Sequence, residues 1–205
     1  LLAEFGDPTV AVVSGAKRVG PDAADPRGGM LGHSDGLYWR YEAFIRRCES
    51  DLGATVASVG EITAVRRADW RPIPAGAVND DAWMTLSNLA RGRNVRFAAG
   101  AESWEAASRS AGLEAARRRR INAGRLLLIT RRDIWPWRRP AVLLAFLSHK
   151  VLRLALPVLM IGGALANLVV VALEPDRLFF AATLAAQLFV FGLALAGYLG
   201  DLTGR

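Results

Sequence analysis

The sequence has few of the residues that build covalent or metal-based sites. Its 205 residues include one cysteine, Cys48, and two histidines, His33 and His149. A lone cysteine excludes an intrachain disulfide and a cysteine-based metal site, and two histidines disfavour a histidine-rich zinc site. We expect Cys48 to behave as a small buried apolar residue. Lysine is also scarce, because Lys17 and Lys150 are the only two lysines among 26 cationic residues.

Charge is absent from two long stretches near the C-terminus. Residues 154–173 and 178–199 contain no Asp, Glu, Lys or Arg. As a helix rising about 1.5 Å per residue, each stretch is long enough to cross a bilayer core of about 30 Å. The pattern argues against a wholly soluble protein and predicts two transmembrane helices. The connector, residues 174–177, is short enough to predict a tight hairpin between them.

Arginine is concentrated just before the first uncharged stretch. Residues 115–140 carry nine arginines and one acid, Asp133. The positive-inside rule therefore predicts that residues 1–140 lie on the cytoplasmic side of the cell membrane. Trp135 and Trp137 indicate the membrane boundary, because tryptophan favours the interface. Residues 131–153 mix apolar and cationic side chains, which predicts an amphipathic segment that lies on the membrane.

The first 140 residues alternate between strand-like and helix-like patterns, which predicts an α/β fold. Short β-branched or alternating runs predict strands or extended segments at 9–14, 55–60, 62–65 and 95–97, and a loop at 20–32. Apolar residues at helical spacing predict helices at 35–50, 82–89 and 102–130, with Gly92 ending the second and a break at Gly112 in the third. No signal peptide is visible. The start at Leu1, without Met, leads us to expect a piece of a longer chain.

An acidic pair, Asp80-Asp81, follows Asn79 between a Pro/Gly-rich loop and a predicted helix. Asn and Asp at a helix N-terminus accept backbone N–H groups and suit the helix dipole, so capping accounts for the pair by itself. Because Asn79 or Asp80 suffices as a cap, Asp81 is left as a rigidly mounted carboxylate, which general-base chemistry requires. Both interpretations stay open at this point.

Four consecutive arginines, residues 117–120, form the second notable feature. On a helix, Arg117 and Arg120 share a face. The run predicts either a basic face attracted to anionic lipid or a clamp for phosphate, which the planar guanidinium suits. Nucleic-acid binding is disfavoured, because no aromatic residues are interleaved for base stacking. Aromatic residues gather instead at Tyr38, Trp39 and Tyr41, as core residues or as faces for sugar rings.

In their order along the chain, these segments resemble the C-terminal half of membrane-bound family 2 glycosyltransferases, the group of the cellulose, chitin, hyaluronan and poly-N-acetylglucosamine synthases. The stretches that carry the resemblance are Val-Val-Ser-Gly (12–15), Gly-Leu-Tyr-Trp-Arg-Tyr-Glu (36–42), Val-Gly-Glu-Ile-Thr-Ala-Val-Arg-Arg (59–67), Asn-Asp-Asp (79–81), Arg-Gly-Arg-Asn-Val-Arg-Phe (91–97), Arg-Arg-Arg-Arg-Ile-Asn-Ala-Gly (117–124) and Ser-His-Lys-Val-Leu-Arg (148–153). The resemblance implies the acceptor-side half of a type A, Rossmann-like catalytic domain over residues 1–130, without its nucleotide-binding half. An interfacial segment, 131–153, and a transmembrane hairpin, 154–205, would follow.

The resemblance implies roles for the acidic pair and for the arginine run. Asp81 matches the catalytic base of an inverting transfer, and Asp80 matches the acid that precedes it. Arg120 matches the arginine of a membrane-proximal Gln-x-x-Arg-Trp motif, in which Arg117 replaces Gln and Ile121 replaces Trp. The arginines expected to bind phosphate and acceptor are therefore Arg117, Arg118 and Arg120.

The resemblance also implies an acceptor pocket, substrates and a cofactor. Gly60, Glu61 and Trp39 match segments that line or adjoin the acceptor pocket. A nucleotide-sugar donor and a glycan or lipid-linked acceptor are implied, with a divalent metal, Mg²⁺ or Mn²⁺, in the intact enzyme. The family's Asp-x-Asp metal motif lies before the segment that matches residues 12–15, where this chain has only Asp7, so we expect a gene fragment or a degenerate remnant without a metal site. The alternative is a non-catalytic membrane protein that binds anionic lipid or a protein partner.

Overall fold

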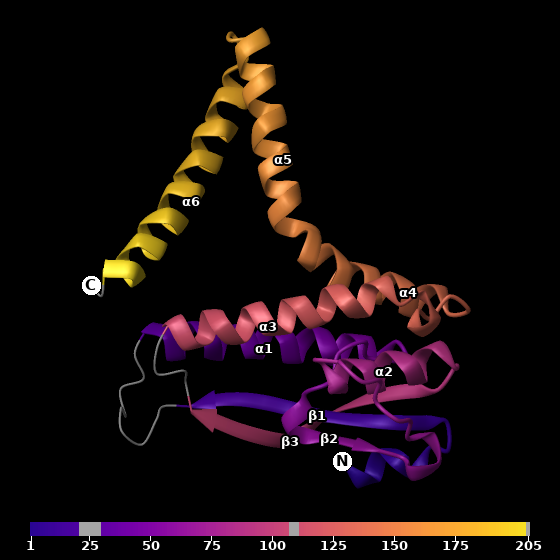
Figure 1. Ribbon diagram of the computed structural model, residues 1–205. Helices are drawn as coiled ribbons and strands as arrows, with labels where there is room; N and C mark the ends of the chain where they lie inside the picture. The colour runs from indigo at the N-terminus through magenta and orange to yellow at the C-terminus, as the bar shows by residue number, and fades with distance from the viewer. Residues whose placement is uncertain (21–29, 107–110, 204–205) are drawn as a thin grey trace. The chain divides into compact units, whose positions relative to one another are not determined.

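The computed structural model describes residues 1–20, 30–106 and 111–203. The chain forms two compact units, Leu1–Val151 and Leu152–Arg205. In the first unit, a small sheet is accompanied by helices (Figure 1). Its strands and longer helices are β1 (Val10–Gly20), α1 (Met30–Asp51), β2 (Thr63–Val65), α2 (Asp80–Ala90), β3 (Asn94–Ala106), α3 (Ala111–Thr130) and α4 (Pro140–Phe146). Short 3-10 turns are η1 (Leu2–Gly6), η2 (Gly60–Ile62), η3 (Arg67–Asp69) and η4 (Arg132–Ile134), and a π-helical turn, η5 (Leu147–Val151), ends the unit.

The sheet is mixed, with the strand order β2-β1-β3. Its central strand, β1, pairs antiparallel with β2 and parallel with β3, so that Val12 faces Val65 on one side and Val95 on the other. Residues 10–13 of β1 are fully buried. A strand buried on both faces takes a continuous apolar run, which is the pattern at the start of β1. The predicted α/β class is confirmed.

Two predicted boundaries are wrong, and one pairing explains both. The strand predicted to end at Gly15 continues to Gly20, and residues 102–106, predicted as helix, form the end of β3. These two extensions are hydrogen-bonded to each other, with Ala16 opposite Glu102 and Gly20 opposite Ala106. Pairing between strands far apart in sequence supplies backbone hydrogen bonds that no local pattern reports.

The predicted helices are present, with shifted limits. α1 begins at Met30 instead of about residue 35, and α3 runs through Gly112 without a break. Of the predicted loop at 20–32, residues 21–29 lie outside the described residues. α2 matches its prediction, and Gly92, just beyond it, has a positive φ of 82°, as a glycine that follows a helix commonly does.

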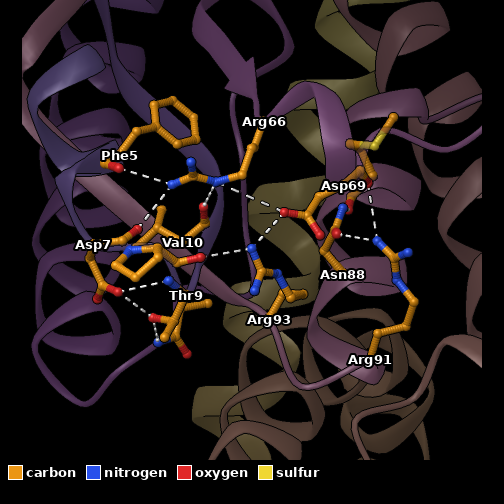
Figure 2. A network of polar contacts seen from close by, with 12 residues as sticks. Phe5, Asp7, Thr9, Val10, Arg66, Asp69, Asn88, Arg91 and Arg93 are labelled. Carbon is orange, nitrogen blue, oxygen red and sulfur yellow. Dashed lines mark hydrogen bonds and ion pairs between the residues drawn. The ribbon is translucent and has the colours of Figure 1, made fainter.

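Arginine side chains fasten the beginning of β1 to the η3 turn (Figure 2). Arg66 donates hydrogen bonds to the carbonyls of Phe5 and Asp7 at 2.9 and 3.0 Å. The Asp69 carboxylate accepts from Arg93 at 2.6 Å and lies 4.0 Å from Arg66. The network satisfies carbonyls that precede the sheet and holds β1 in place before it reaches the candidate site.

The second unit is a pair of apolar helices, α5 (Leu152–Leu173) and α6 (Leu178–Thr203). Two helical runs of the described chain, Pro140–Leu173 and Leu178–Gly200, are long and apolar enough to cross a membrane. The amide of Asn167 on α5 is buried and lies 2.9 Å from Thr183 Oγ1 and 3.1 Å from Gln187 Oε1 on α6. Such polar contacts between helices are a common feature of membrane hairpins.

Candidate active site

Asp81 lies in the first turn of α2, and one of its oxygens is held there. Asp81 Oδ1 accepts the Ala82 N–H at 2.7 Å, and Asp80 Oδ1 accepts the Asp81 N–H at 2.9 Å. Asn79, the residue before the helix, makes no capping hydrogen bond with its side chain. Both acids therefore accept first-turn N–H groups, so the expectations that Asn79 could serve as the cap and that Asp81 would take no part in it are wrong. The remaining Asp81 oxygen, Oδ2, is not used by the cap.

Gly60 lies directly against the Asp81 carboxyl group. A Cβ atom added to Gly60 would lie 3.7 Å from Asp81 Cβ and 3.9 Å from Oδ2. Ser58, two residues earlier, donates to the Asp81 carbonyl at 3.0 Å and is 2.6 Å from Thr85 Oγ1. These bonds fix the segment before Gly60 to α2. The structure thus brings together two of the residues singled out from the sequence, Gly60 and Asp81.

The surroundings of Asp81 raise the pKa of its carboxyl group above the ordinary value. Burial is the largest cause, and the nearby charges of Asp80 and Glu61 add to it. The Ala82 N–H bond and the positive charge of Lys150 act in the opposite direction. A carboxylate with a raised pKa is a stronger base than an exposed aspartate, which is the property that proton abstraction needs.

The Glu61 carboxylate is contacted by cations from both β1 and α3. Lys17, buried on β1, donates to Glu61 Oε1 at 2.7 Å, and Arg117 of α3 reaches the same oxygen at 3.5 Å. Lys17 and Arg117 both pair with Glu105 as well. Partial burial opposes ionisation of Glu61, but the Lys17 hydrogen bond and the two cationic charges outweigh it, and the pKa of Glu61 is lowered.

α3 packs closely on the start of α2. The Asn79 side chain donates to the carbonyl of Ile121 at 2.9 Å instead of capping α2. A Cβ atom on Gly124 would come within 2.9 Å of three Asn79 side-chain atoms, so only glycine fits this contact without a shift. Because α3 approaches the start of α2 closely here, Arg117 of the same helix comes within reach of Glu61.

The other two arginines assigned to phosphate and acceptor binding do not join this cluster. Arg118 is 63% exposed and pairs with Glu114 of its own helix at 2.7 Å. Arg120 is exposed, and no hydrogen bond or ion pair links it to another side chain in the described part of the chain. Of the three arginines, the structure brings Arg117 alone to the Gly60–Glu61 segment.

Trp39 of α1 belongs to the same cluster through its ring. The Lys17 ammonium lies 5.2 Å and the Arg46 guanidinium 5.6 Å from the ring centroid, and the Tyr38 ring meets it edge to face. Cations over an indole face are attracted by its quadrupole. Because Lys17 also binds Glu61, two of the predicted pocket residues, Trp39 and Glu61, share one cation.

The chain also matches a known protein family. The sequence model of the glycosyl transferase family group 2 matches residues 1–198. The chain belongs to this family. No curated protein matches the chain significantly. The resemblance carried by the ordered motifs is therefore confirmed, and it extends over nearly the whole of this family 2 glycosyltransferase domain.

The divalent ion expected of a family 2 glycosyltransferase does not fit the residues described. Residues 1–20, 30–106 and 111–203 contain no group of three or more His, Cys, Asp or Glu side chains that could hold a metal ion. Asp80 and Asp81, the two adjacent acids, each use an oxygen for a backbone N–H. These side chains alone do not form a metal site.

A buried charged face of α1 was not predicted from the sequence. His149 Nδ1 lies 2.7 Å from Glu49, its Nε2 lies 3.2 Å from Glu42, and Arg46 lies 3.6 Å from Glu42. The positions 42, 46 and 49 follow helical spacing, which is a signal for one shared face. Because α1 turns this face inward, Cys48 is exposed, and its predicted burial is wrong.

Lys150 is a second residue whose importance the sequence did not reveal. The pKa of its ammonium group is lowered to about 8, mainly by burial and also by the charges of Arg46 and Arg125, while the charges of Glu42 and Asp81 act in the opposite direction. Among the described residues, no side chain forms an ion pair with Lys150. It belongs to the first unit and precedes the uncharged stretch 154–173.

We expect Gly124→Ala to lower stability and Gly112→Ala to raise it, although both lie on α3. Alanine favours a helix over glycine by about 1 kcal/mol, and nothing lies within 4 Å of the Gly112 position. At Gly124 the added methyl displaces Asn79 from Ile121, an overpacking that costs about 1–3 kcal/mol. Thermal unfolding in detergent micelles measures both variants, and equal shifts in Tm would contradict the close α2–α3 contact.

Proposed function

We propose that this chain forms the acceptor side of an inverting glycosyltransferase, which moves a sugar from a nucleotide-sugar donor to a glycan or lipid-linked acceptor. Asp81 Oδ2 takes the proton from an acceptor hydroxyl as that oxygen attacks the anomeric carbon. The bond between this carbon and the nucleoside diphosphate breaks, and the diphosphate leaves with the electron pair. Arg117 is the arginine best placed to attract the leaving negative charge.

The observation that carries the proposal is that the two oxygens of the Asp81 carboxyl group have different surroundings. Asp81 Oδ1 is fixed by the Ala82 N–H, which sets the direction of the side chain. Oδ2 lies beside Gly60, where an added Cβ atom would come within 3.9 Å of the oxygen. A fixed, partly buried carboxylate with an oxygen outside the cap is suited to act as a general base.

We also propose how the chain is positioned at the membrane. Residues 154–173 and 178–199 would span it, residues 131–153 would lie at its surface, and residues 1–130 would form the catalytic half in the cytoplasm. Trp137 and Leu144 support this position, because they expose 55% and 68% of their surface in the segment assigned to the interface. Anionic lipid would attract the arginines that precede it.

A transfer assay tests the function. Membranes that carry the complete gene product are incubated with radiolabelled nucleotide sugars, one at a time, and glycan and lipid fractions are counted. We expect label in one of these fractions, accompanied by release of nucleoside diphosphate. If no donor transfers label, and anionic vesicles bind the chain through residues 117–120, the non-catalytic alternative takes the place of this proposal.

The raised pKa of Asp81 predicts the pH dependence of transfer. The base must be ionised, so kcat/KM is full above the raised pKa and falls as the pH drops through it, at a higher pH than the ordinary aspartate value of 3.8 permits. In Asp80→Asn the acid limb moves to lower pH, because one like charge beside Asp81 is removed. A pH–rate profile of both proteins checks this, and an unmoved acid limb in the variant would refute the assignment.

A further inference from the structure

Residues 37–51 of α1, the part of this helix with described side chains, have the reverse of the usual polarity. A helix on the surface of a soluble domain normally turns its apolar side inward and its charged side outward. The buried residues of this part are all polar or charged, namely Glu42, Arg46, Glu49 and Ser50. The exposed residues are mainly apolar or aromatic, namely Leu37, Tyr38, Tyr41, Phe44 and Cys48, with Arg40, Arg47 and Asp51. The outer side of α1 is therefore the side that suits an apolar contact.

Three large side chains form a stripe along that outer side. Leu37, Tyr41 and Phe44 follow the spacing i, i+4 and i+7, so they share one face of the helix. Their exposed fractions are 64%, 56% and 63%. Single exposed apolar residues are common on soluble proteins, whereas a continuous apolar patch commonly marks an interaction surface. We call these three residues the α1 stripe, and Cys48 lies one helical turn beyond it.

The buried side of α1 connects the helix to the segment that precedes the first predicted membrane span. His149 Nδ1 lies 2.7 Å from Glu49 Oε1, and its Nε2 lies 3.2 Å from Glu42 Oε2. The uncharged stretch begins at residue 154, five residues after His149. Five residues cover at most about 18 Å even when the chain is fully extended. The covalent chain therefore keeps the buried side of α1 within reach of the residue at which the predicted span begins.

The charged residues beside the stripe favour a lipid surface as its partner. Arg40 and Arg47 are exposed and lie two turns apart on the same helix, while the exposed acid Asp51 is its last residue. A helix that lies in a membrane interface combines bulky apolar side chains, which enter the acyl boundary, with cations that meet the lipid phosphates. Tyrosine at position 41 fits the same place, because it combines an apolar ring with a polar hydroxyl group.

We propose that the α1 stripe docks on the cytoplasmic leaflet of the membrane, with Arg40 and Arg47 directed at lipid phosphates. The contacts of His149 with Glu42 and Glu49 join α1 to the segment before the first span and so bring the stripe to the same surface. This inference rests on the membrane position proposed above, but not on the transfer reaction. It gives the catalytic half a second lipid contact, about 100 positions before residues 131–153 in the sequence.

The single cysteine allows a direct test. A nitroxide label is attached to Cys48 of the full chain in vesicles of phosphatidylcholine and phosphatidylglycerol. Electron paramagnetic resonance then compares its collisions with oxygen, which concentrates in lipid, and with a nickel chelate, which stays in water. We expect oxygen collisions to exceed chelate collisions at Cys48.

Two control labels are placed in a Cys48→Ser background. Glu4→Cys lies in η1, which is beyond the sheet from α1 (Figure 1), so its label should collide mainly with the chelate. Leu168→Cys lies on α5, within the first predicted span, so its label should collide mainly with oxygen. If the Leu168 label instead meets the chelate, the proposed membrane position fails. If it meets oxygen while the Cys48 label meets the chelate, the docking of the stripe alone fails.

Two further results at Cys48 would overturn the inference. Dipolar broadening between labels would show that a second copy of the chain covers the stripe, and exclusion of both reagents would show that other protein covers it. Removing the stripe tests the same contact, because Leu37→Ser combined with Phe44→Ser should move the Cys48 label toward the chelate. Trp70→Ser, which replaces an aromatic residue that is 53% exposed outside α1, is the matched control and leaves the label unchanged. An unchanged label in the double variant would contradict the lipid contact.

Discussion

Asp81→Asn reduces sugar transfer by about 10²–10⁴-fold, the usual contribution of a general base. Asparagine has the same shape, and its Oδ1 still accepts the N–H of Ala82, so the first turn of α2 is kept. The substitution puts an amide nitrogen in place of the proton acceptor Oδ2 and removes the negative charge. Donor binding stays close to that of wild type, because Arg117, the cation proposed to attract the diphosphate, lies on α3 and is unchanged.

Transfer and donor binding are measured on the same preparation of the complete gene product. Transfer is followed with radiolabelled donor, and binding is followed by equilibrium dialysis of the same nucleotide sugar. Asp80→Asn, assayed at a pH above the acid limb, is the matched control, since Asp80 also accepts a backbone N–H, whereas the three atoms nearest to a Cβ at Gly60 all belong to Asp81. Undiminished turnover in Asp81→Asn would exclude Asp81 as the base.

Gly15→Ala disrupts the sheet that supports the site, and we expect it to cost about 3 kcal/mol or more, as severe overpacking does. A Cβ atom at position 15 would lie 2.3 Å from the backbone oxygen of Ala101 and 3.0 Å from the Ile62 side chain. The oxygen belongs to β3, whose register with β1 shifts between Gly15 and Ala16. The strands must separate locally, because a backbone atom cannot rotate away as the end of a side chain can.

The consequences of that separation reach the candidate site. Ser14, the neighbour of Gly15, accepts the Val59 N–H on its hydroxyl at 2.8 Å, directly before Gly60. We therefore expect Gly15→Ala to lower both the denaturant midpoint in detergent and the transfer rate. Gly100→Ala on β3 is the control, because nothing lies within 4 Å of that position, and its effect should stay within about 0.5 kcal/mol. Equal midpoints for the two variants would contradict the close contact between β1 and β3 at Gly15.

Local patterns predicted the elements that local interactions determine. α2 has an acidic N-terminus, helical spacing and Gly92 beyond its end, and the structure agrees with the prediction closely. The β1 and β3 extensions could not be predicted, because their hydrogen bonds join residues more than 80 positions apart, such as Ala16 and Glu102. Residues 102–106 have no strand-like alternation of their own and become a strand through their partner.

In the candidate site, too, some residues could be predicted from the sequence and others could not. The motif order singled out Asp81, Gly60 and Glu61, and the structure brings these three residues to one place. The Glu49–His149 contact joins residues 100 positions apart, so no local sequence pattern around either residue predicts it.

Helical spacing alone could not predict the different contacts of Arg117 and Arg118. The spacing groups Arg117 with Arg120, but it cannot tell which arginine finds an acid on another element. Arg117 does so because Gly124 lets α3 approach Asn79 closely, and Glu61 lies within its reach. Arg118 meets Glu114 one turn away on its own helix and stays exposed.

The distance from Asp81 to a bound acceptor tests the central claim most directly, because it does not depend on how a substitution affects folding. An experimental structure of the complete enzyme, with an unreactive donor analogue and an acceptor, would provide it. The account predicts that the attacking hydroxyl oxygen lies about 2.6–3.2 Å from Asp81 Oδ2, within reach for proton transfer. An acceptor bound with its reactive hydroxyl against a different base, and with Asp81 Oδ2 turned away from it, would contradict the account.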